Sequence, residues 1–208
     1  MAIRKMMQLG LLFILPFLLC SCATVGIEKA KYKVIDKEGK FEIRQYTPQI
    51  VAETVVDSSF DEAANIAFSR LFKYISGNNR TKESIAMTSP VNQKESSEKI
   101  KMTAPVNQQS YEGKYIVSFL MPSKYTMETL PEPLDANVKL RTTPAYKAAV
   151  IRYSGSWGKK RYIEHRNLLK DFVKRKGLKI IGEDIFARYD PPFQLWFVRR
   201  NEVLFPVE

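Results

Sequence analysis

Residues 59–76 read SFDEAANIAFSRLFKYIS, and this stretch sets the architecture of the chain. Ser59 and Glu62 form a capping box, in which the serine hydroxyl accepts from an orphan backbone amide and the glutamate reaches back, so the pattern predicts a helix from here to about Ser76. The sequence Gly77-Asn78-Asn79 ends it. At about 100° per residue, five side chains form one core-facing stripe: Phe60, Ala64, Ala67, Leu71 and Ile75.

Strands are predicted on both sides of this helix. Before it, residues 41–46 and 50–56 alternate apolar and polar side chains, with Pro48 between them. After it, a motif occurs twice, as IAMTSPVNQ at 85–93 and IKMTAPVNQ at 100–108. Each copy alternates and then reaches a proline, which predicts a strand that runs to a sheet edge or bulge, with residues 94–99 as the connecting loop. Residues 114–121 complete the first half.

The second half repeats this order. Strands are predicted at 138–142 and 147–153, then a helix capped by Ser156 and running to about Lys176 with Gly177 after it, then strands at 179–188 and 194–205. Leu71 and Leu168, 97 positions apart, occupy matching helix positions. The sequence therefore predicts an internal duplication of β-β-α-β-β halves and an α+β fold, with an antiparallel sheet system and two helices on it.

Four motifs carry a family resemblance. They are FSRLFKYISGN at 68–78, Met-Thr-[Ser/Ala]-Pro-Val at 87–91 and 102–106, YDPPF at 189–193 and RRNEV at 199–203. In this order they resemble the SOUL family of haem-binding proteins over residues 32–207. The resemblance implies that the halves pair about a pseudo-twofold axis as a distorted barrel. The same plan is similar to the effector-binding domains of multidrug-responsive regulators, which hold flat apolar ligands.

The resemblance also implies a site, a hydrophobic cleft between the first helix and a late loop. Phe68 and Phe72 lie at the margin of the helix stripe, so they are either ordinary core or the floor of a groove that stacks a macrocycle. Lys73 either swings toward a propionate or is a solvated charge. The late loop supplies the other expected haem-binding residues, and its prolines are expected to hold it extended. These residues are Tyr189, Pro191, Pro192 and Phe193.

The implied ligand is haem b or a related tetrapyrrole, bound without a covalent link. His165 is the only histidine, and its position near the apolar face of the second helix favours a packed side chain with a local hydrogen bond. It belongs to the other half, so it is a doubtful axial ligand. Met87 and Met102 are expected in the core, as are Trp157 and Trp196. We therefore expect no metal site made by protein ligands and an affinity that rests on apolar contact.

The N-terminus predicts export. Arg4 and Lys5 precede an apolar run from Leu9 to Leu19, which is shorter than the about 20 residues that span a bilayer. The following Cys20-Ser21-Cys22 resembles the end of a bacterial lipobox, in which Cys22 is acylated; the alternative is an ordinary secretory signal. The predicted parts are a signal peptide at 1–21, a lipidated tether at 22–31 and a domain at 32–208. Ala23, rather than aspartate, favours the outer membrane, facing the periplasm.

Cysteine content and charge exclude several classes of site. The chain has two cysteines, both in the lipobox region, so the mature domain would have no thiol for disulfides, thiolate catalysis or covalent haem. Of 33 lysine and arginine side chains, two lie in the signal, which leaves 31 against 22 acidic ones. The basic residues form no tract, so no nucleic-acid partner is expected. The expected partners are porphyrin and, through the anchor, the membrane, and the chain is expected to be a monomer.

No catalytic constellation is recognisable. The segment Ser154-Gly155-Ser156-Trp157-Gly158 is not a nucleophile elbow, and zinc, dinucleotide and phosphate-loop motifs are absent. Adjacent Glu183 and Asp184 would point to opposite faces of a strand. A tetrapyrrole-binding lipoprotein that sequesters or carries haem is therefore the first interpretation, and no enzyme is expected. The alternatives are an envelope interaction or structural protein without ligand, and a small-molecule hydrolase in the same cleft with Glu53 or Glu128 as acid.

Overall fold

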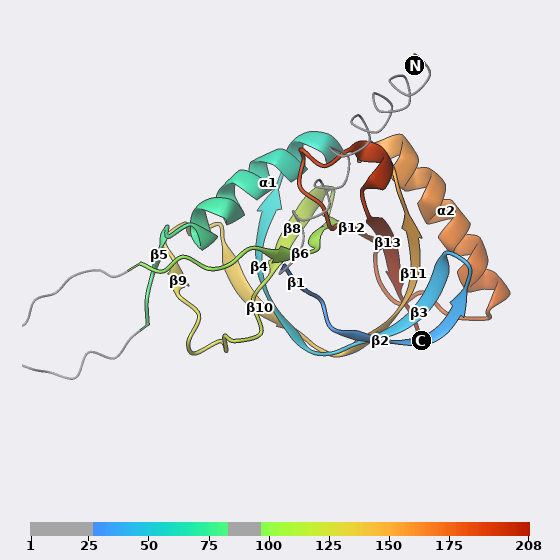
Figure 1. Cartoon of the computed structure of the whole chain (residues 1–208), viewed down its shortest axis with the longest axis horizontal. Coiled ribbons are helices and arrows are strands. Elements are labelled where there is room, and N and C mark those ends of the chain that lie inside the picture. The colour runs from blue at the N-terminus through green and yellow to red at the C-terminus, as the bar shows by residue number, and fades with distance from the viewer. Residues whose placement is uncertain (1–26, 83–96) are drawn as a thin grey trace, which may run out of the picture.

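The computed structural model describes residues 27–82 and 97–208. Its main element is an antiparallel sheet of nine strands, which Figure 1 shows curled into a half-barrel. In chain order the strands are β2 (Tyr32–Glu38), β3 (Phe41–Tyr46), β4 (Gln49–Val56), β7 (Val106–Tyr111), β8 (Lys114–Leu120), β10 (Lys139–Thr143), β11 (Tyr146–Tyr153), β12 (Ile185–Arg188) and β13 (Asn201–Pro206). Two helices, α1 (Phe60–Ile75) and α2 (Lys159–Arg175), pack on it. Within the described residues, neither helix is long and apolar enough to cross a membrane.

The order of the strands shows a pseudo-twofold relation between the halves. Across the sheet the order is β10-β4-β8-β7-β12-β13-β11-β3-β2. If β2 is set aside, β10 corresponds to β3, β4 to β11, β8 to β13 and β7 to β12, with the axis between β7 and β12. Each half also gives its first strand to the other, because β3 pairs with β11 and β10 pairs with β4. The predicted α+β architecture of two β-β-α-β-β halves is confirmed.

Both helices cover the same face of the sheet. Side chains alternate along a strand, so Ala52 of β4 points to α1 while Ile151 of β11 points to α2. The predicted stripe of α1 is confirmed, since all five of its residues are buried. Ser59 caps α1 as predicted by accepting from the backbone amide of Glu62. The Glu62 carboxylate reaches back as predicted: it accepts from the hydroxyls of Ser58 and Ser59, and hydrogen bonds from these hydroxyls and from the Ser59 backbone lower its pKa.

The Met-Thr-Pro motif differs from its prediction. Its first copy, at 85–93, lies outside the described residues. In the second copy, Pro105 does not end the pairing: the short strand β6 (Thr103–Ala104) precedes a cis peptide bond to Pro105, and β7 begins directly after it. Proline lacks an amide hydrogen, and the chain changes partners here, from β1 (Glu28–Lys29) to β8 and β12.

Three predictions in the second half are also wrong in detail. Helix α2 starts after Gly158 with no side-chain cap, so Ser156 does not cap it. The strand predicted at 179–188 forms only over its end, as β12 (185–188). The strand predicted at 194–205 begins with a 3₁₀ turn, η1 (Trp196–Val198), and only its end belongs to a strand, β13 (201–206). Leu168 is exposed, and its neighbour Leu169 takes the buried position that corresponds to Leu71.

The chain is joined to the domain from its first described residues. Within the range predicted as a tether, β1 pairs with β6 in parallel, and the backbone amide of Ala30 donates to the carbonyl of Ala104 at 3.1 Å. Ile27 and Ala30 also pack against a buried cluster on the sheet face opposite to the helices. A second small sheet pairs β5 (Asn79–Arg80) with β9 (Glu132–Pro133) at the far end of α1.

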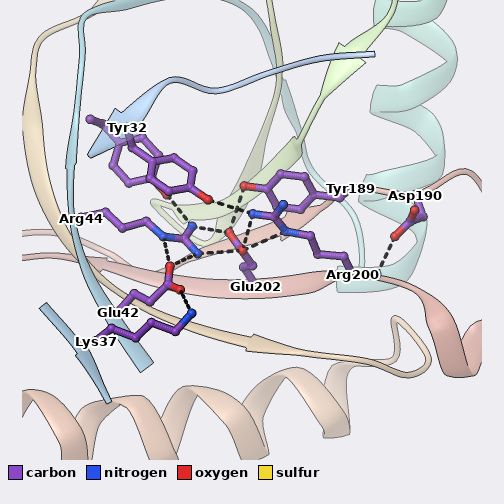
Figure 2. Close-up of polar contacts among 9 residues, drawn as sticks. Tyr32, Lys37, Glu42, Arg44, Tyr189, Asp190, Arg200 and Glu202 are labelled. Atoms are coloured by element: carbon purple, nitrogen blue, oxygen red, sulfur yellow. Dashed lines mark hydrogen bonds and ion pairs between the residues drawn. The ribbon is translucent and has the colours of Figure 1, made fainter. Parts of the chain in front are cut away.

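A buried charge network occupies the face opposite to the helices (Figure 2). At its centre the carboxylate of Glu202 on β13 is fully buried, and Arg44 on β3 is 1% exposed. Arg44 donates to both Glu202 oxygens, at 2.8 and 3.0 Å, and Arg200 donates to one of them at 2.7 Å. The hydroxyl of Tyr189 donates to the other at 2.9 Å. The Nε of Arg200 also donates to Glu202, at 3.0 Å, so five hydrogen bonds compensate one buried carboxylate.

Both arginines make further contacts around Glu202. The Arg44 side chain also donates to Glu42 at 2.7 Å, and its guanidinium lies 4.2 Å from the centre of the Tyr32 ring. Arg200 donates to the Tyr32 hydroxyl at 3.2 Å. Burial alone would raise the pKa of Glu202, but the hydrogen bonds and charges of the two arginines outweigh it and lower that pKa below its usual value. The network thus joins β2, β3, β13 and the segment after β12.

The core position of Leu71 gives a stability prediction. Leu71→Ala is expected to lower the free energy of unfolding by about 2–5 kcal/mol, because it removes buried surface and leaves a cavity. Lys73→Ala, two residues along the same helix, is expected to leave it almost unchanged. Urea denaturation measures both, and equal losses would mean that the helix face has been assigned wrongly.

The network predicts a second stability effect, together with a pH dependence. Glu202→Gln is expected to cost about 3–5 kcal/mol, because it leaves Arg44 buried without its counter-charge. Since the pKa of Glu202 is lower in the folded state, its contribution is present above the unfolded pKa and is lost as the pH falls through the folded one. Urea titrations from pH 7 to about pH 3 should therefore show a smaller acid loss in Glu202→Gln than in the unchanged protein.

The pair of Glu53 and Arg141, which is less buried than Glu202 and Arg44, is the matched control. Arg141 donates to Glu53 across strands β10 and β4, and half of the Arg141 side chain is open to solvent. Glu53→Gln should cost no more than about 1 kcal/mol. A Glu202→Gln variant no less stable than Glu53→Gln would contradict the central role of the network.

Candidate functional site

An apolar groove lies between α1, the segment before β7 and the loop after β12, with a volume of about 430 Å³. Ile27, the first described residue of the chain, and Trp157, just before α2, also line it. The residues of α1 and of the two other segments that line it are Ala64, Asn65, Phe68, Ser69, Phe72, Met102, Thr103, Ala104, Val106 and residues 188–193.

The structure brings most of the predicted cleft residues together. Six of them line this groove: Phe68, Phe72, Tyr189, Pro191, Pro192 and Phe193. The exception is Lys73, which borders a separate hollow with Arg70 and Asp135 on another side of α1. A role for the six and for Lys73 in haem binding stays a prediction, and Lys73 is not among the side chains that line the groove.

The two phenylalanines of α1 divide between core and surface. Their rings stack with centroids 5.8 Å apart, and Phe68 packs its edge against Phe119 of the core at 5.4 Å. Phe68 is partly buried, but 48% of Phe72 is exposed. Phe68 therefore belongs both to the core and to the groove wall, and Phe72 forms an open apolar rim.

The loop from Tyr189 to Phe193 is not extended throughout as its prolines predicted, because the chain turns from Pro191 to Gln194. The amide of Gln194 donates to the carbonyl of Pro191 at 3.1 Å, which closes the turn. The loop is held at its base because the amide of Arg200 donates to the Asp190 carboxylate at 2.5 Å (Figure 2). The Tyr189 hydroxyl reaches Glu202, as described above, so the charge network fixes this wall of the groove.

Arg188 is the functional candidate that sequence analysis missed. Its guanidinium lies 4.9 Å from the Phe186 ring centre and 5.7 Å from that of Trp157, and it donates to the side-chain oxygen of Gln108. Its Nε is buried and has no hydrogen-bond partner among the described residues, and none of their carboxylates forms an ion pair with it. Burial lowers the pKa of Arg188 to about 10, which leaves it charged at neutral pH.

The groove thus combines apolar walls with one incompletely paired cation. The signal for Arg188 was present in the sequence, since strand alternation places it on the same face as Phe186. It went unused because a single arginine in a strand has no distinctive pattern. A buried guanidinium with a free donor favours an anionic oxygen, such as a carboxylate of a ligand.

His165 packs as predicted, away from the groove. One ring nitrogen, Nδ1, lies 2.8 Å from the carbonyl oxygen of Arg161, and the ring stacks on Tyr153 with centroids 3.7 Å apart. Burial lowers the pKa of His165, which favours the neutral ring. Met102, predicted in the core, is partly buried and lines the groove, where its thioether is the only soft metal ligand among the described lining residues.

Other candidate residues are placed elsewhere. Trp196 is exposed and is not the core anchor that was predicted, whereas Trp157 is partly buried beside the groove. Asp184 is buried against the Tyr162 hydroxyl, and burial raises its pKa. Glu53 pairs with Arg141, and Glu128 borders a different hollow. The described residues contain no cluster of three or more side chains able to hold a metal ion.

Two curated proteins are similar to the chain over most of its length. Over 184 residues it is 26% identical to heme-binding protein 2 of Mus musculus, a match that covers 84% of this chain and 85% of that protein. It is also 26% identical to heme-binding protein 1 of Xenopus tropicalis over 185 residues, 86% of this chain and 92% of that protein.

Two solved structures share the fold. The C-terminal domain of EcmrR superposes with a TM-score of 0.57 at 13% identity, covering 85% of this chain and 98% of that one. A hydrolase from Listeria innocua gives a TM-score of 0.53 at 11% identity, covering 84% and 94%. At such identities the likeness concerns the scaffold and does not transfer a function.

The family is shown by the sequence as a whole. The two curated relatives carry haem-binding names, and the groove is lined by residues of three of the four motifs. A family model described as SOUL heme-binding protein matches residues 27–206, which spans every described element from β1 to β13. The chain therefore belongs to the SOUL heme-binding protein family.

Proposed function

We propose that this protein binds haem b or a related tetrapyrrole non-covalently in the groove, and that it sequesters or carries this ligand without catalysing a reaction. The observation that carries the proposal is the groove itself, with Phe68 and Phe72 on one wall and the Tyr189–Phe193 loop on the other. Family membership supports haem as the ligand.

Apolar contact supplies the main part of the affinity in this proposal. Burial of apolar surface is worth about 25 cal/mol per Å², so several hundred Å² are enough for roughly micromolar binding after the cost of association. The volume of about 430 Å³ lies within the usual range of ligand sites. The rim residues Phe72 and Phe193 are exposed, which leaves one edge of a bound macrocycle accessible and suits a ligand that must be released.

Arg188 supplies orientation. Its guanidinium lines the groove and forms no ion pair with a carboxylate of the described residues, so a propionate that enters the groove would make a charge-assisted hydrogen bond with it without displacing another carboxylate. Haem would supply an iron whose protein ligation is weak, because among the described residues no imidazole or thiolate lines the groove and Met102 is the single soft group there.

The location is part of the same proposal. We propose that Cys22 is acylated and holds the protein in the bacterial cell envelope, at the periplasmic face of the outer membrane. The lipobox-like sequence and the apolar run before it support this placement. The formal charge of +9 left after removal of residues 1–21 suits a position close to anionic lipid.

Hemin titration followed by the visible spectrum tests the ligand. The unchanged protein is expected to give a saturable Soret shift at roughly micromolar hemin. Phe72→Asp should abolish it, because it puts a charge on the apolar rim, whereas His165→Ala should leave it nearly intact. The reverse pattern would make His165 the ligand. No saturation in the unchanged protein at tens of micromolar hemin would favour an interaction protein that has lost its ligand.

The same titration separates Arg188 from Lys73. Arg188→Met should weaken hemin binding about 10- to 100-fold, the value of a hydrogen bond to a charged group, but should barely change binding of hemin dimethyl ester, which has no free carboxylate. Lys73→Met is the matched control and should change neither. If Arg188→Met weakens both ligands equally, Arg188 contributes packing and does not hold a carboxylate.

Membrane fractionation and fatty-acid labelling test the anchor. Cys22→Ser should remove the label and release the protein from the membrane fraction, because the thiol that forms the thioether is lost. Cys20→Ser should keep both. A Cys22→Ser protein that still sediments with outer membranes and takes up fatty acid would contradict the lipoprotein assignment.

A further inference from the structure

Residues 193–198, here called the apolar loop, present large apolar side chains to solvent. Phe193 is 77% exposed, and the others lie between 50% and 59%: Leu195, Trp196, Phe197 and Val198. None of the five belongs to the buried clusters of the described residues. No other run of this length occurs among their exposed large hydrophobic residues. A contiguous patch of this kind is uncommon on a soluble monomer and marks an interaction site.

Hydrogen bonds to backbone carbonyls order the loop. The Arg199 guanidinium donates to the carbonyls of Pro192 and Gln194, at 2.5 and 2.8 Å, and the amide of Val198 donates to the carbonyl of Leu195 at 3.1 Å. Arg199 also lies 4.3 Å from the Trp157 ring centre, which fixes the loop to the body of the domain. Backbone groups that are paired in this way can approach hydrocarbon without losing hydrogen bonds to water.

The side chains are those found at a membrane interface. Tryptophan and phenylalanine settle at the level of lipid headgroups, and nearby cations are attracted to anionic lipid. The exposed Lys159 and Lys160 follow Trp157 closely in sequence, at the start of α2. The apolar loop and this pair of lysines therefore lie at the same end of the domain, where Figure 1 shows η1 beside the start of α2.

Chain length places the predicted anchor near this end. Ile27 and Phe193 line the same groove, and Cys22 precedes Ile27 by five residues. Five residues span at most about 17 Å when fully extended. An acyl chain on Cys22 therefore holds the bilayer surface within that distance of Ile27, which borders the groove. This step rests on the acylation put forward under the proposed function.

We propose that the apolar loop inserts into the interface of the bilayer that carries the lipid anchor, so that the mouth of the groove faces the membrane. Phe193 belongs to both the loop and the groove wall, so an apolar ligand dissolved in the bilayer enters the groove without crossing water. The partner is a phospholipid bilayer, and the contact combines apolar insertion with attraction of lysine to anionic headgroups.

Tryptophan fluorescence of the full chain in vesicles tests this. The protein is reconstituted in vesicles of phosphatidylethanolamine and phosphatidylglycerol, with or without brominated acyl chains. Trp157→Phe leaves Trp196 as the single reporter. For the control, Trp157→Phe and Trp196→Phe are combined with Ile35→Trp, which places the reporter on β2, at the opposite side of the molecule from η1 in Figure 1 and equally exposed, at 55%.

Brominated lipid is expected to quench Trp196 about twofold, because an interfacial side chain lies close to the upper acyl carbons, and to leave the reporter at position 35 unchanged. Aqueous iodide should quench the reporter at position 35 more strongly than Trp196. Trp196 that is open to iodide and insensitive to brominated lipid overturns the proposal. Trp196 shielded from both quenchers means that a second copy of the chain covers the loop, and this also overturns it.

Fatty-acid labelling of the same preparation separates this inference from the anchor. Labelled protein with unquenched Trp196 refutes loop insertion and still supports the lipid anchor. Unlabelled protein with quenched Trp196 supports insertion by the loop itself and refutes the anchor. As a further variant, Phe197→Ser should reduce the quenching of Trp196 by brominated lipid, while the hemin Soret shift, which depends on Phe72, stays unchanged.

Discussion

The carboxylate of Glu202 lies out of contact with water between the guanidinium groups of Arg44 and Arg200, and much of the site follows from this contact. Arg44 comes from β3 and Glu202 from β13, two strands that are separated in the sheet by β11. Tyr189 adds the end of β12 through its hydroxyl. Three segments distant in sequence are therefore held in one arrangement by donors that share a single acceptor group.

The network adds little net stability, because the desolvation of three charged groups offsets most of their attraction, although the loss of one member is costly. Its functional effect is geometric. Tyr189 begins the loop that forms one wall of the groove, and Asp190 in the same loop accepts from the amide of Arg200. The charge network, on the sheet face opposite to the helices, thus fixes this wall of the groove. The exposed side of the same loop can therefore carry apolar residues.

Elements with a clear periodicity could be predicted from the sequence. The α1 stripe and β3 were found because side-chain burial repeats with the helix or strand period, and the groove residues on them followed from the family motifs. The stretch 194–205 was misjudged because the run of apolar residues around Trp196 resembles a buried strand, although it has no neighbouring strand to pair with. The sequence pattern shows that these side chains are apolar but does not show whether other elements bury them.

Single residues whose role depends on distant neighbours could not be found in this way. The angle of Lys73 on the helix predicted that it reaches a ligand, whereas in the structure it borders a hollow with Asp135 and is not among the groove-lining residues. Arg188 became a candidate only when α1, Trp157 and β12 were placed around it. The unpaired Nε that distinguishes it is a property of the assembled surroundings and has no counterpart in the local sequence.

The exchange of first strands between the halves has a consequence for how the chain acquires its structure. β3 finds its partner β11 only in the second half, and β10 returns to β4 in the first, so neither half can complete its own sheet. A polypeptide of half the length would meet the same pairings only as an intertwined homodimer. In the present chain the exchange makes the contacts strongly non-local, which slows folding, and the sheet cannot be completed before both halves of the chain are available.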